Sequence, residues 1–406
     1  MSEWKKGSLG QLAEIVKGDQ VNSDTLDQTG KYPVINGGTE PSGYLDRWNR
    51  ESGSITISEG GNSCGFVSLM RQRFWSGGHC YTLRNVRIYN TYLYHFLKYT
   101  QQDIMKLRVG SGLPNIQRKD ISEHEIYYPT DNNEQVEIAG FLSTIDEVIE
   151  KTEAAIEKYK AIKAGMMQDL FTRGIDVKTG KLRPSFKEAP ELYKETELGW
   201  IPKEWEVCTI KEACLEFVNG GTPSTKNAAN WVGTIPWITG ADFLDTFEVG
   251  VVRRQINEEA LRNSSSHLIR KGNILLVTRT GVGKLAIAPF DVAISQDITG
   301  IILDPSTYCV EFFYYYLQIL VENFKKINQG TSINGIIRSD LEATTIVKPP
   351  IEEQKQIADV LKTLDVALKN EQRDLNKYRD LKQGLMADLL TGKVRVKINE
   401  DILENS

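Results

Sequence analysis

The sequence lacks the long apolar runs that a membrane protein needs. Its most apolar stretches, such as Ile274–Val277 and the tyrosine-rich Val310–Leu317, are far too short to cross a bilayer. The N-terminal sequence MSEWKKGSLG has no apolar signal-peptide region, which argues against secretion. Five cysteines form no CxxC pair, and their number is odd. This usage favours buried thiols in a reducing compartment, so we expect a cytoplasmic protein with no membrane contact.

The chain also lacks an excess of charge of one sign. It has 49 Lys and Arg residues against 54 Asp and Glu residues, for a net charge of −5 over 406 residues. This balance neither supports nor excludes a nucleic-acid partner, because a protein that binds DNA needs a local basic face and not a basic whole. The length allows two or three domains, each with its own core.

Candidate metal and phosphate sites are weak. The four histidines are scattered without metal-ligand spacing, and Cys64, His79 and Cys80 are better interpreted as two buried thiols beside a surface histidine. The stretch 279–285 (RTGVGKL) resembles the end of a phosphate-binding loop. However, Thr278 replaces the leading glycine and Leu285 replaces the required Ser or Thr, so we reject that interpretation.

Motifs of catalysis are absent as well. An amino-methyltransferase needs an Asn/Asp-Pro-Pro-aromatic tetrad, and the only Pro-Pro here, Pro349-Pro350, precedes a predicted helix. No GxSxG or HExxH motif occurs. The sequence therefore predicts a non-catalytic chain with no metal site and no cofactor of its own.

What the chain does contain is a long internal repeat. Residues 134–172 match residues 353–391 at a constant shift, with identities that include Glu134/Glu353 and Asp146/Asp365. Upstream, 110–129 pairs with 330–349 with one residue of slippage, and Tyr32–Gly37 resembles Ile235–Gly240. A repeat of this length indicates two copies of one structural unit. The globular parts diverge strongly while the 39-residue segments stay alike, so the scaffold is shared and the globular surfaces differ.

Each repeated segment has the apolar periodicity of a long amphipathic helix. Asp131 lies three residues before Glu134 in a capping-box arrangement, and Pro349-Pro350 precede the second helix. The intervals are close to a heptad, which predicts that the two helices pack as a coiled coil. The predicted packing residues are Leu142, Ile145, Ile149, Ile156, Tyr159, Ile162 and Met166 in the first copy and Leu361, Leu364, Leu368, Leu375, Tyr378, Leu381 and Leu385 in the second.

We therefore predict an α+β protein in which two globular α/β domains are joined by two long antiparallel helices with an internal pseudo-two-fold repeat. Segments 53–57 and 272–277 are expected to be strands that enter glycine-rich turns, whereas 92–101 and 310–323 are expected to be helical. The predicted order is recognition domain 1–133, helix 134–172, linker 173–204, recognition domain 205–350, helix 351–392 and tail 393–406.

This arrangement suggests a bivalent DNA-binding protein. From Asp146 to Thr172, each helix would be about 40 Å long at ~1.5 Å per residue. One turn of B-DNA is about 34–36 Å, which is the natural spacing between two half-sites on one face of the duplex. Two different half-sites separated by a fixed spacer would then be bound together, with higher affinity than either half-site alone.

The residues resemble the specificity subunit of type I restriction-modification enzymes. The resemblance covers nearly the whole chain and rests on the duplicated helices, on 195–207 (ETELGWIPKEWEV) and on 349–358 (PPIEEQKQIA). It implies two target recognition domains, each of which binds one half of a bipartite, asymmetric sequence in double-stranded DNA. One departure is that Glu3-Trp4 opens the first domain without the Glu-Leu-Gly-x-Ile-Pro lead of the second.

The resemblance also implies partners. The repeated helices would form the spacer and bind two methyltransferase subunits, which supply S-adenosylmethionine chemistry on adenine. Restriction subunits with translocase activity would complete the assembly and use ATP and Mg²⁺. The cofactors would therefore belong to the partner subunits.

Candidate DNA contacts follow from the chemistry of recognition. Phosphates are bound by Lys, Arg and backbone N–H groups, and base edges by Arg, Asn, Gln, Ser or Thr on projecting loops. The first-domain candidates are Asn36, Thr39, Arg47, Arg50, Arg71 and Arg73, with Asn36–Thr39 as a close-approach loop. The second-domain candidates are Ser224, Thr225, Lys226, Arg253, Arg254, Arg279, Thr280 and Lys284. For each of them an ordinary solvated side chain is the alternative. Arg118 and Arg338 recur and suggest shared structure or phosphate binding.

Two other functions remain open at this point. A coiled-coil adaptor that binds only proteins agrees with the near-neutral charge, but it does not explain why the globular domains diverge. A self-sufficient methyltransferase or nuclease is disfavoured by the missing motifs.

Overall fold

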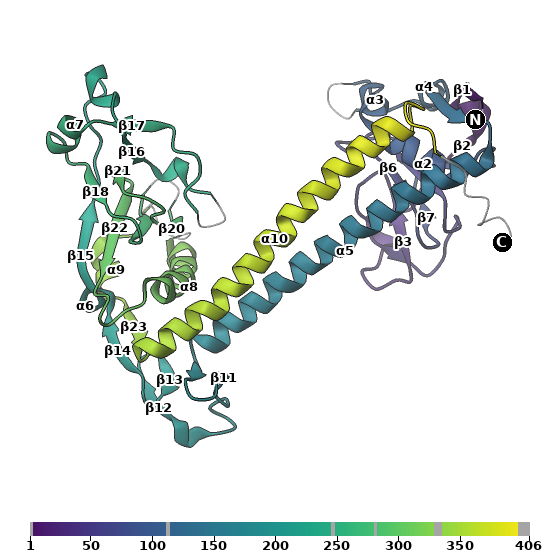
Figure 1. Ribbon diagram of the computed structural model, residues 1–406. Helices are drawn as coiled ribbons and strands as arrows, with labels where there is room; N and C mark the ends of the chain where they lie inside the picture. Colours follow the sequence, from purple (N-terminus) through teal and green to yellow (C-terminus); the bar gives the residue numbers. More distant parts are fainter. Residues whose placement is uncertain (1–2, 111–113, 245–247, 280–281, 329–334, 397–406) are drawn as a thin grey trace. The chain divides into compact units, whose positions relative to one another are not determined.

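The computed structural model describes residues 3–110, 114–244, 248–279, 282–328 and 335–396. The chain forms two compact units, of which unit 1 is Met1–Ala155 with Glu371–Ser406 and unit 2 is Ile156–Asn370. Two 39-residue helices, α5 (Asn132–Leu170) and α10 (Ile351–Leu389), each contribute to both units (Figure 1). The predicted fold class, two mixed globular domains joined by two long repeated helices, is confirmed.

Unit 1 contains one antiparallel sheet, one mixed sheet and a separate strand pair. Its strands are β1 (Trp4–Ser8), β2 (Glu14–Lys17), β3 (Tyr32–Ile35), β4 (Tyr44–Leu45), β5 (Ile55–Ser58), β6 (Val67–Leu69), β7 (Trp75–Ser76), β8 (Cys80–Arg84) and β9 (Glu125–Pro129). Its shorter helices are α1 (Leu9–Leu12), η1 (Ser23–Thr25), α2 (Asn90–Tyr99), α3 (Gln101–Lys106) and α4 (Arg118–Ser122). The strands form the antiparallel sheet β2-β8-β5-β6, the sheet β4-β3-β7 with β3 parallel to β7, and the pair β1-β9.

Unit 2 repeats this plan with one additional strand and a longer aromatic helix. Its strands are β14 (Glu206–Thr209), β15 (Cys214–Asn219), β16 (Ile235–Ile238), β17 (Arg254–Ile256), β18 (His267–Ile269), β19 (Ile274–Val277), β20 (Leu285–Ile287), β21 (Val292–Ile294), β22 (Ile298–Leu303) and β23 (Thr345–Lys348). Its shorter helices are α6 (Ile210–Ala213), η3 (Ala228–Trp231), η4 (Gly240–Asp242), α7 (Glu258–Arg262), α8 (Val310–Asn328) and α9 (Arg338–Ala343).

The sheets of unit 2 correspond strand by strand to those of unit 1. The sheet β15-β22-β19-β20 matches β2-β8-β5-β6, and β14-β23 matches β1-β9. The sheet β17-β16-β21-β18 matches β4-β3-β7 with one added strand, and β16 is again parallel to β21. The predicted strands before the glycine-rich turns are confirmed as β5 and β19, and the predicted aromatic helices as α2 and α8.

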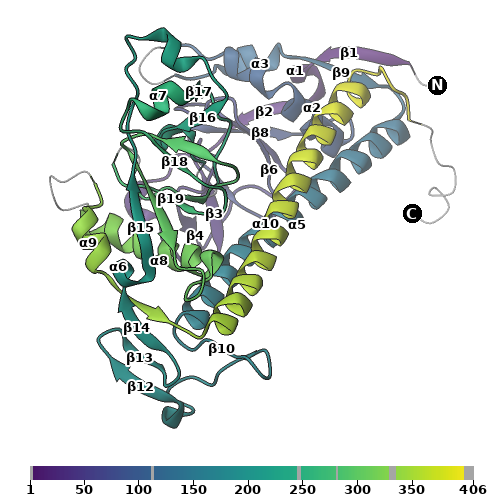
Figure 2. The same ribbon diagram turned by 60° about the vertical axis from the view of Figure 1, so that its left-hand side comes forward.

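In each unit the core joins the sheets to both long helices. In unit 1, Ile138 and Leu142 of α5 and Leu389 of α10 are buried in one cluster with strand residues such as Ile55. In unit 2, Leu170 and Leu361 are buried in a cluster with residues of β19 and α8. The two helices run side by side in opposite directions within each unit (Figures 1 and 2). The buried apolar residues near the ends of the helices therefore hold each globular part against the helix segments of its own unit.

The segment between the two globular parts also folds. Residues 173–204 contain the hairpin β10 (Ile175–Asp176) with β11 (Lys181–Leu182), the short helix η2 (Pro190–Leu192) and the hairpin β12 (Tyr193–Thr196) with β13 (Gly199–Pro202). Ile175 and Ile201 are buried in the core of unit 2. This segment is thus part of the unit 2 structure.

Candidate DNA-recognition residues and the paired helices

Two of the candidate arginines in unit 1 are bound to carboxylates. Arg71 Nη1 lies 2.8 Å from Glu150 Oε2 on α5, and Arg73 Nε lies 2.8 Å from Glu51 Oε2. Hydrogen bonding to these carboxylates raises the pKa of both guanidinium groups. The Arg73 guanidinium also lies over the exposed ring of Trp48, 4.5 Å from its centroid. A phosphate would have to compete with carboxylates at both positions.

The other two arginines of unit 1 have different surroundings. Arg50 donates to the backbone oxygens of Asn49 at 2.8 Å and Lys17 at 3.5 Å, and so it joins two backbone segments. Arg47 is exposed, and its guanidinium lies 4.8 Å from the ring centroid of Trp75. Among the described residues, no carboxylate forms an ion pair with Arg47.

The candidate loop Asn36–Thr39 is tied to the neighbouring backbone. Asn36 Oδ1 accepts a hydrogen bond from the backbone N–H of His79 at 3.1 Å. Gly37 is buried with φ +88°, and its carbonyl accepts hydrogen bonds from the hydroxyls of Ser58 and Ser63. A side chain at position 37 would clash with the His79 carbonyl, so the glycine is required by local structure. Thr39 is the exposed member of this loop.

In unit 2 the candidate residues Ser224, Thr225 and Lys226 form an exposed turn. The Ser224 carbonyl accepts hydrogen bonds from Asn230 Nδ2 at 3.1 Å and from Trp231 Nε1 at 3.3 Å. The backbone of the turn is therefore held, while its three side chains stay accessible.

The two adjacent arginines of unit 2 differ in the same way as those of unit 1. Arg253 binds Asp242, whose side chain is buried, with an Nη2–Oδ1 distance of 3.0 Å. Asp242 also accepts from the hydroxyl of Thr239 at 2.9 Å, which fixes this carboxylate. Arg254 is exposed and lies 4.6 Å from the ring centroid of Trp237. In the described part of the chain, it has no carboxylate partner.

The remaining candidates of unit 2 lie near the turn after β19. Arg279 is exposed, and Lys284 donates to the Phe243 carbonyl at 2.9 Å. Thr280 lies outside the described residues. Of the recurring pair, Arg338 binds Glu342 within α9 and lies over Phe217, which indicates a structural role for it.

The predicted packing residues of the helices are mostly buried or half-buried. Leu142, Ile145, Ile156, Leu361 and Leu375 are buried, and Ile149, Tyr159, Met166, Leu364, Leu368, Tyr378 and Leu385 are half-buried. Two residues differ. Ile162 and Leu381 are 39% and 52% exposed, and they occupy the same position of the repeat. Their exposure is a shared property of both copies, so these two side chains are not part of the packing between the helices.

Two ion pairs between the helices are formed by equivalent residues of the two copies of the repeat. In unit 1 Lys382 pairs with Asp146, and in unit 2 Lys163 pairs with Asp365 at 2.5 Å. Lys163 corresponds to Lys382, and Asp146 corresponds to Asp365. Each copy therefore supplies the lysine of one pair and the aspartate of the other, as in the self-complementary interface of a two-fold dimer.

A buried histidine lies behind the first of these pairs. His95 on α2 is 1% exposed, and its Nε2 lies 3.1 Å from Ser143 Oγ of α5. Burial lowers the pKa of His95 to about 4, against a smaller opposing effect of Asp146, so the ring is neutral at pH 7. The ring borders a surface pocket of about 460 Å³ in unit 1, whose rim includes Arg71 and Glu150.

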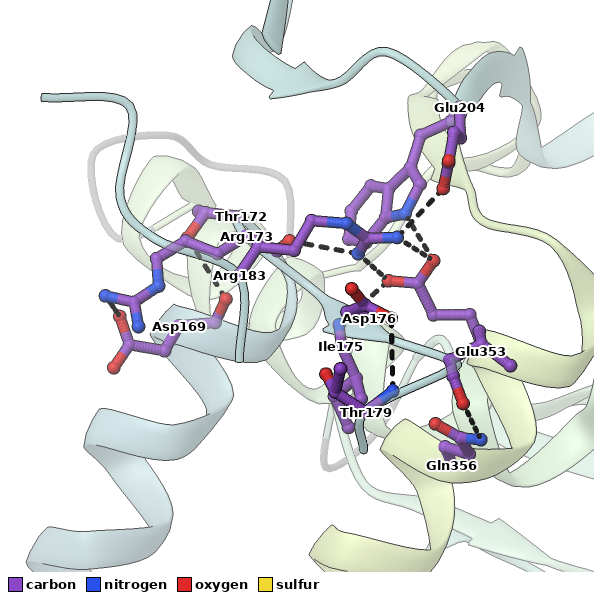
Figure 3. Close-up of polar contacts among 12 residues, drawn as sticks. Asp169, Thr172, Arg173, Ile175, Asp176, Thr179, Arg183, Glu204, Glu353 and Gln356 are labelled. Carbon is purple, nitrogen blue, oxygen red and sulfur yellow. Dashed lines mark hydrogen bonds and ion pairs between the residues drawn. The ribbon is translucent and has the colours of Figure 1, made fainter. Parts of the chain in front are cut away.

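The start of each long helix is held by a buried glutamate. In unit 2 the carboxylate of Glu353, fully buried, accepts from Arg183 Nη2 at 2.9 Å and from Trp205 Nε1 at 3.0 Å (Figure 3). It also accepts from the backbone N–H of Ile175 at 2.9 Å. Figure 3 shows that the Arg183 guanidinium lies between this carboxylate and Glu204. We call Arg183, Glu353 and Trp205 the unit 2 clasp.

Unit 1 has the corresponding arrangement. Arg395, which follows α10, donates to both oxygens of Glu134 at 2.8 and 3.0 Å. The same guanidinium lies 5.4 Å from the ring centroid of Trp4. We call Arg395, Glu134 and Trp4 the unit 1 clasp. In each unit, an arginine of the chain that leaves one helix therefore binds a glutamate in the first turn of the other helix. The tryptophans differ in their contacts, because Trp205 donates to the glutamate in unit 2, whereas Trp4 contacts the arginine in unit 1.

Comparison with known proteins identifies the family. Residues 1–158 and 202–377, which together make up most of the chain, match the family described as the type I restriction modification DNA specificity domain. The chain belongs to this specificity family. The two matched segments also reflect its internal duplication, because each contains one globular part and most of one long helix.

Individual proteins that are similar to this chain in sequence or in fold are also specificity subunits. The putative type I restriction enzyme MjaX specificity subunit of Methanocaldococcus jannaschii is 30% identical over 65% of this chain and 58% of its own length. The MjaIX specificity subunit of the same organism is 36% identical over 45% of this chain. The chain spans 58% and 42% of the lengths of these two relatives. The S subunit of the type I restriction-modification system from M. genitalium has the same fold, with a TM-score of 0.68 over 96% of both chains at 21% identity.

Sequence reasoning missed the clasps of this specificity-family chain. Their signal was present, because Gly180-Lys-Leu-Arg183 and Gly392-Lys-Val-Arg395 are a second, shorter repeat. Both glycines adopt a positive φ, +67° and +70°, which favours glycine at the turn before each arginine. The different numbers of residues between helix and motif in the two copies hid the match.

Proposed function

We propose that this chain is the DNA-recognition subunit of a type I restriction-modification complex, in which each unit binds one half of a bipartite, asymmetric site. The observation that supports the proposal best is the contrast between shared scaffold and divergent surfaces. The helix pair, its ion pairs and its clasps recur in both copies, whereas the exposed cations of the two units come from unrelated positions. One shared scaffold with two unlike surfaces suits the recognition of two unlike sequences.

The helices would set the distance between the half-sites. Each helix contains 39 residues, which corresponds to about 58 Å at ~1.5 Å per residue. In each unit, buried apolar residues and a clasp hold the globular part against the helix segments of that unit. Helices of fixed length that join the two recognition units would favour a constant spacer between the half-sites, because a tether of set length limits the separations at which both units bind together.

Catalysis would belong to partner subunits. Two methyltransferase subunits would bind the helix pair and supply S-adenosylmethionine, and restriction subunits with translocase activity would supply ATP and Mg²⁺ chemistry. Among the described residues, no cluster of His, Cys, Asp and Glu suits a metal ion, and no helix is long and apolar enough to cross a membrane. We propose a cytoplasmic location, because the substrate would be chromosomal or incoming DNA.

The repeat offers one surface for each methyltransferase subunit. Ile162 and Leu381 are exposed at equivalent positions, and each lies one helical turn before a glycine, Gly165 or Gly384, with open space around it. An exposed apolar side chain beside open backbone lets a partner helix approach closely. The duplicated chain would therefore bind two copies of the partner in the same way.

Reconstitution tests the proposal. The chain, the methyltransferase subunit from the same host and labelled S-adenosylmethionine should methylate duplex DNA at one sequence, whereas neither protein alone should do so. A chain that methylates DNA without the partner would contradict the non-catalytic assignment. A complex that methylates DNA equally well when an unrelated specificity chain replaces this one would contradict its role in recognition.

A further inference from the structure

In each unit, the chain after the first sheet strand passes beside the parallel strand pair and hydrogen-bonds to it at an equivalent residue. In unit 1, the Asp19 N–H donates to the Ser76 carbonyl at 2.8 Å, and the preceding Gly18 N–H donates to Cys80. In unit 2, the Gly221 N–H donates to the Ile294 carbonyl at 3.0 Å, and the preceding N–H of residue 220 donates to residue 298. Asp19 and Gly221 therefore occupy the same position of the fold.

The carbonyl at this position binds a tryptophan in both units. Trp75 Nε1 donates to the Asp19 carbonyl at 3.0 Å, and Trp237 Nε1 donates to the Gly221 carbonyl at 3.2 Å. The two tryptophans are not equivalent in sequence. Trp75 lies on β7 opposite Val34 of β3, whereas Trp237 lies on β16, the equivalent of β3, opposite Ala293. The two indoles therefore come from neighbouring, non-equivalent strands but donate to equivalent backbone carbonyls.

An exposed arginine covers each of these indoles. The guanidinium groups of Arg47 and Arg254 lie 4.8 and 4.6 Å from the ring centroids of Trp75 and Trp237. The arginines also come from different positions, because Arg47 follows β4 by two residues and Arg254 is the first residue of β17. The two units therefore build the same Trp–Arg pair from non-equivalent residues.

These two arginines differ from their neighbours in charge balance. Arg71, Arg73 and Arg253 each bind a carboxylate. Within the described ranges, neither Arg47 nor Arg254 has such a partner, and the only polar contact of Arg254 is a long one of 3.5 Å from Nη2 to Thr239 Oγ1. An arginine that served the fold alone would gain from a carboxylate, because an unpaired cation adds no ion-pair energy to the folded state.

The Trp–Arg pair prepares the guanidinium for binding. Stacking on the indole face is a cation–π contact, and it restricts the rotation of the side chain before a ligand arrives. Both side chains are exposed, and a guanidinium can donate two parallel N–H groups in the geometry that matches guanine O6 and N7 or two phosphate oxygens. In Arg254 such a ligand would replace the long contact of Nη2 with Thr239.

We propose that Arg47 and Arg254 are the principal DNA-contacting arginines of units 1 and 2, each donating two N–H groups to a pair of acceptors on its half-site. This inference rests on the proposed function, and it selects two residues from the fourteen candidates. The acceptor pair is a guanine edge or a phosphate, which share the same bidentate chemistry.

The test is to substitute each arginine in turn, to express the variant chain in its native host, and to sequence the methylated DNA sites. Arg47→Ala and Arg254→Ala should each weaken DNA binding by the reconstituted complex by roughly 5- to 150-fold, the range expected for one bidentate contact. Arg47→Lys and Arg254→Lys should show most of this loss, because lysine cannot make the planar contact. Arg73→Ala is the matched control, since Arg73 also lies over a tryptophan but is bound to Glu51.

The sequence of the methylated sites separates the two acceptors. Relaxed discrimination at one base of a single half-site would support a guanine contact, and uniform weakening without a change of sequence would support a phosphate contact. Parental affinity and sequence in both alanine variants, with unchanged thermal unfolding, would overturn the inference. If the parental complex itself methylates no specific sequence, the proposed function fails instead.

Discussion

Glu134 and Glu353 are the carboxylates on which the clasps depend. Glu353 is fully buried and Glu134 is 2% exposed, and both depend on an arginine supplied by the chain that leaves the other helix. A buried carboxylate is stable only when it is paired and hydrogen-bonded. The clasps therefore make the start of each helix sensitive to a residue far away in sequence.

Removal of the arginine should be costly. We expect Arg183→Ala to lower the free energy of unfolding by about 3–5 kcal/mol, because Glu353 is then buried without its counter-charge. Lys160→Ala is the control, because its pair with Glu157 is exposed and should contribute at most about 1 kcal/mol. Chemical denaturation of both variants measures the difference. Equal stabilities for the two variants would contradict the structural role of the clasp.

For single residues, the sequence indicated which residue types could contact DNA, but it did not show which of these side chains are already bound to other groups. The fourteen DNA-contact candidates remain predictions. Charge and residue type could not separate Arg47 from Arg71, because the separation depends on Glu150, a carboxylate 79 residues away in the chain. The Trp–Arg pairs were also invisible to alignment of the two halves, since non-equivalent residues build them.

The long helices are the elements that the sequence predicted most completely. A periodic apolar stripe repeated in two copies fixes helix type and packing face, and the helices are observed as Asn132–Leu170 and Ile351–Leu389. The short hairpins of 173–204 gave no such signal, because strands of two to four residues are too short to show periodicity. The parallel pairing of β3 with β7 and of β16 with β21 depends on contacts between distant segments, which local patterns do not contain.

The exposed repeat positions give a prediction about partner binding. If the proposed docking is correct, Ile162→Glu should weaken methyltransferase binding at one of two sites by at least roughly 10-fold, and Leu381→Glu should do so at the other, because a charge replaces an apolar contact. Titration calorimetry of the chain with the methyltransferase subunit measures both affinity and stoichiometry.

The control for this titration is a glutamate introduced at another exposed position of α5. Gln168→Glu adds the same charge at an exposed position elsewhere on α5 and should leave two sites of parental affinity. If Ile162→Glu and Leu381→Glu both still bind two partners as tightly as the parental chain, the docking surface lies elsewhere.

At the scale of the whole molecule, duplication explains the balance between similarity and divergence. The core clusters, the ion pairs and the Glu–Arg pairs of the clasps use largely equivalent residues in the two units. The exposed turns differ between the units in sequence. If the proposed function holds, a change in one globular part should change one half of the recognised sequence and leave the other half unchanged.

The most direct test of this account is methylome sequencing of the host with the parental chain and with a chimera in which residues 1–133 come from another specificity chain. The donor should have tryptophan at the position of Trp4, so that the unit 1 clasp is kept. We predict that the parental host shows two unlike half-sites at one constant separation, and that the chimera changes only one half-site and keeps the separation. A single continuous site, or a chimera that leaves the recognised sequence unchanged, would contradict the account.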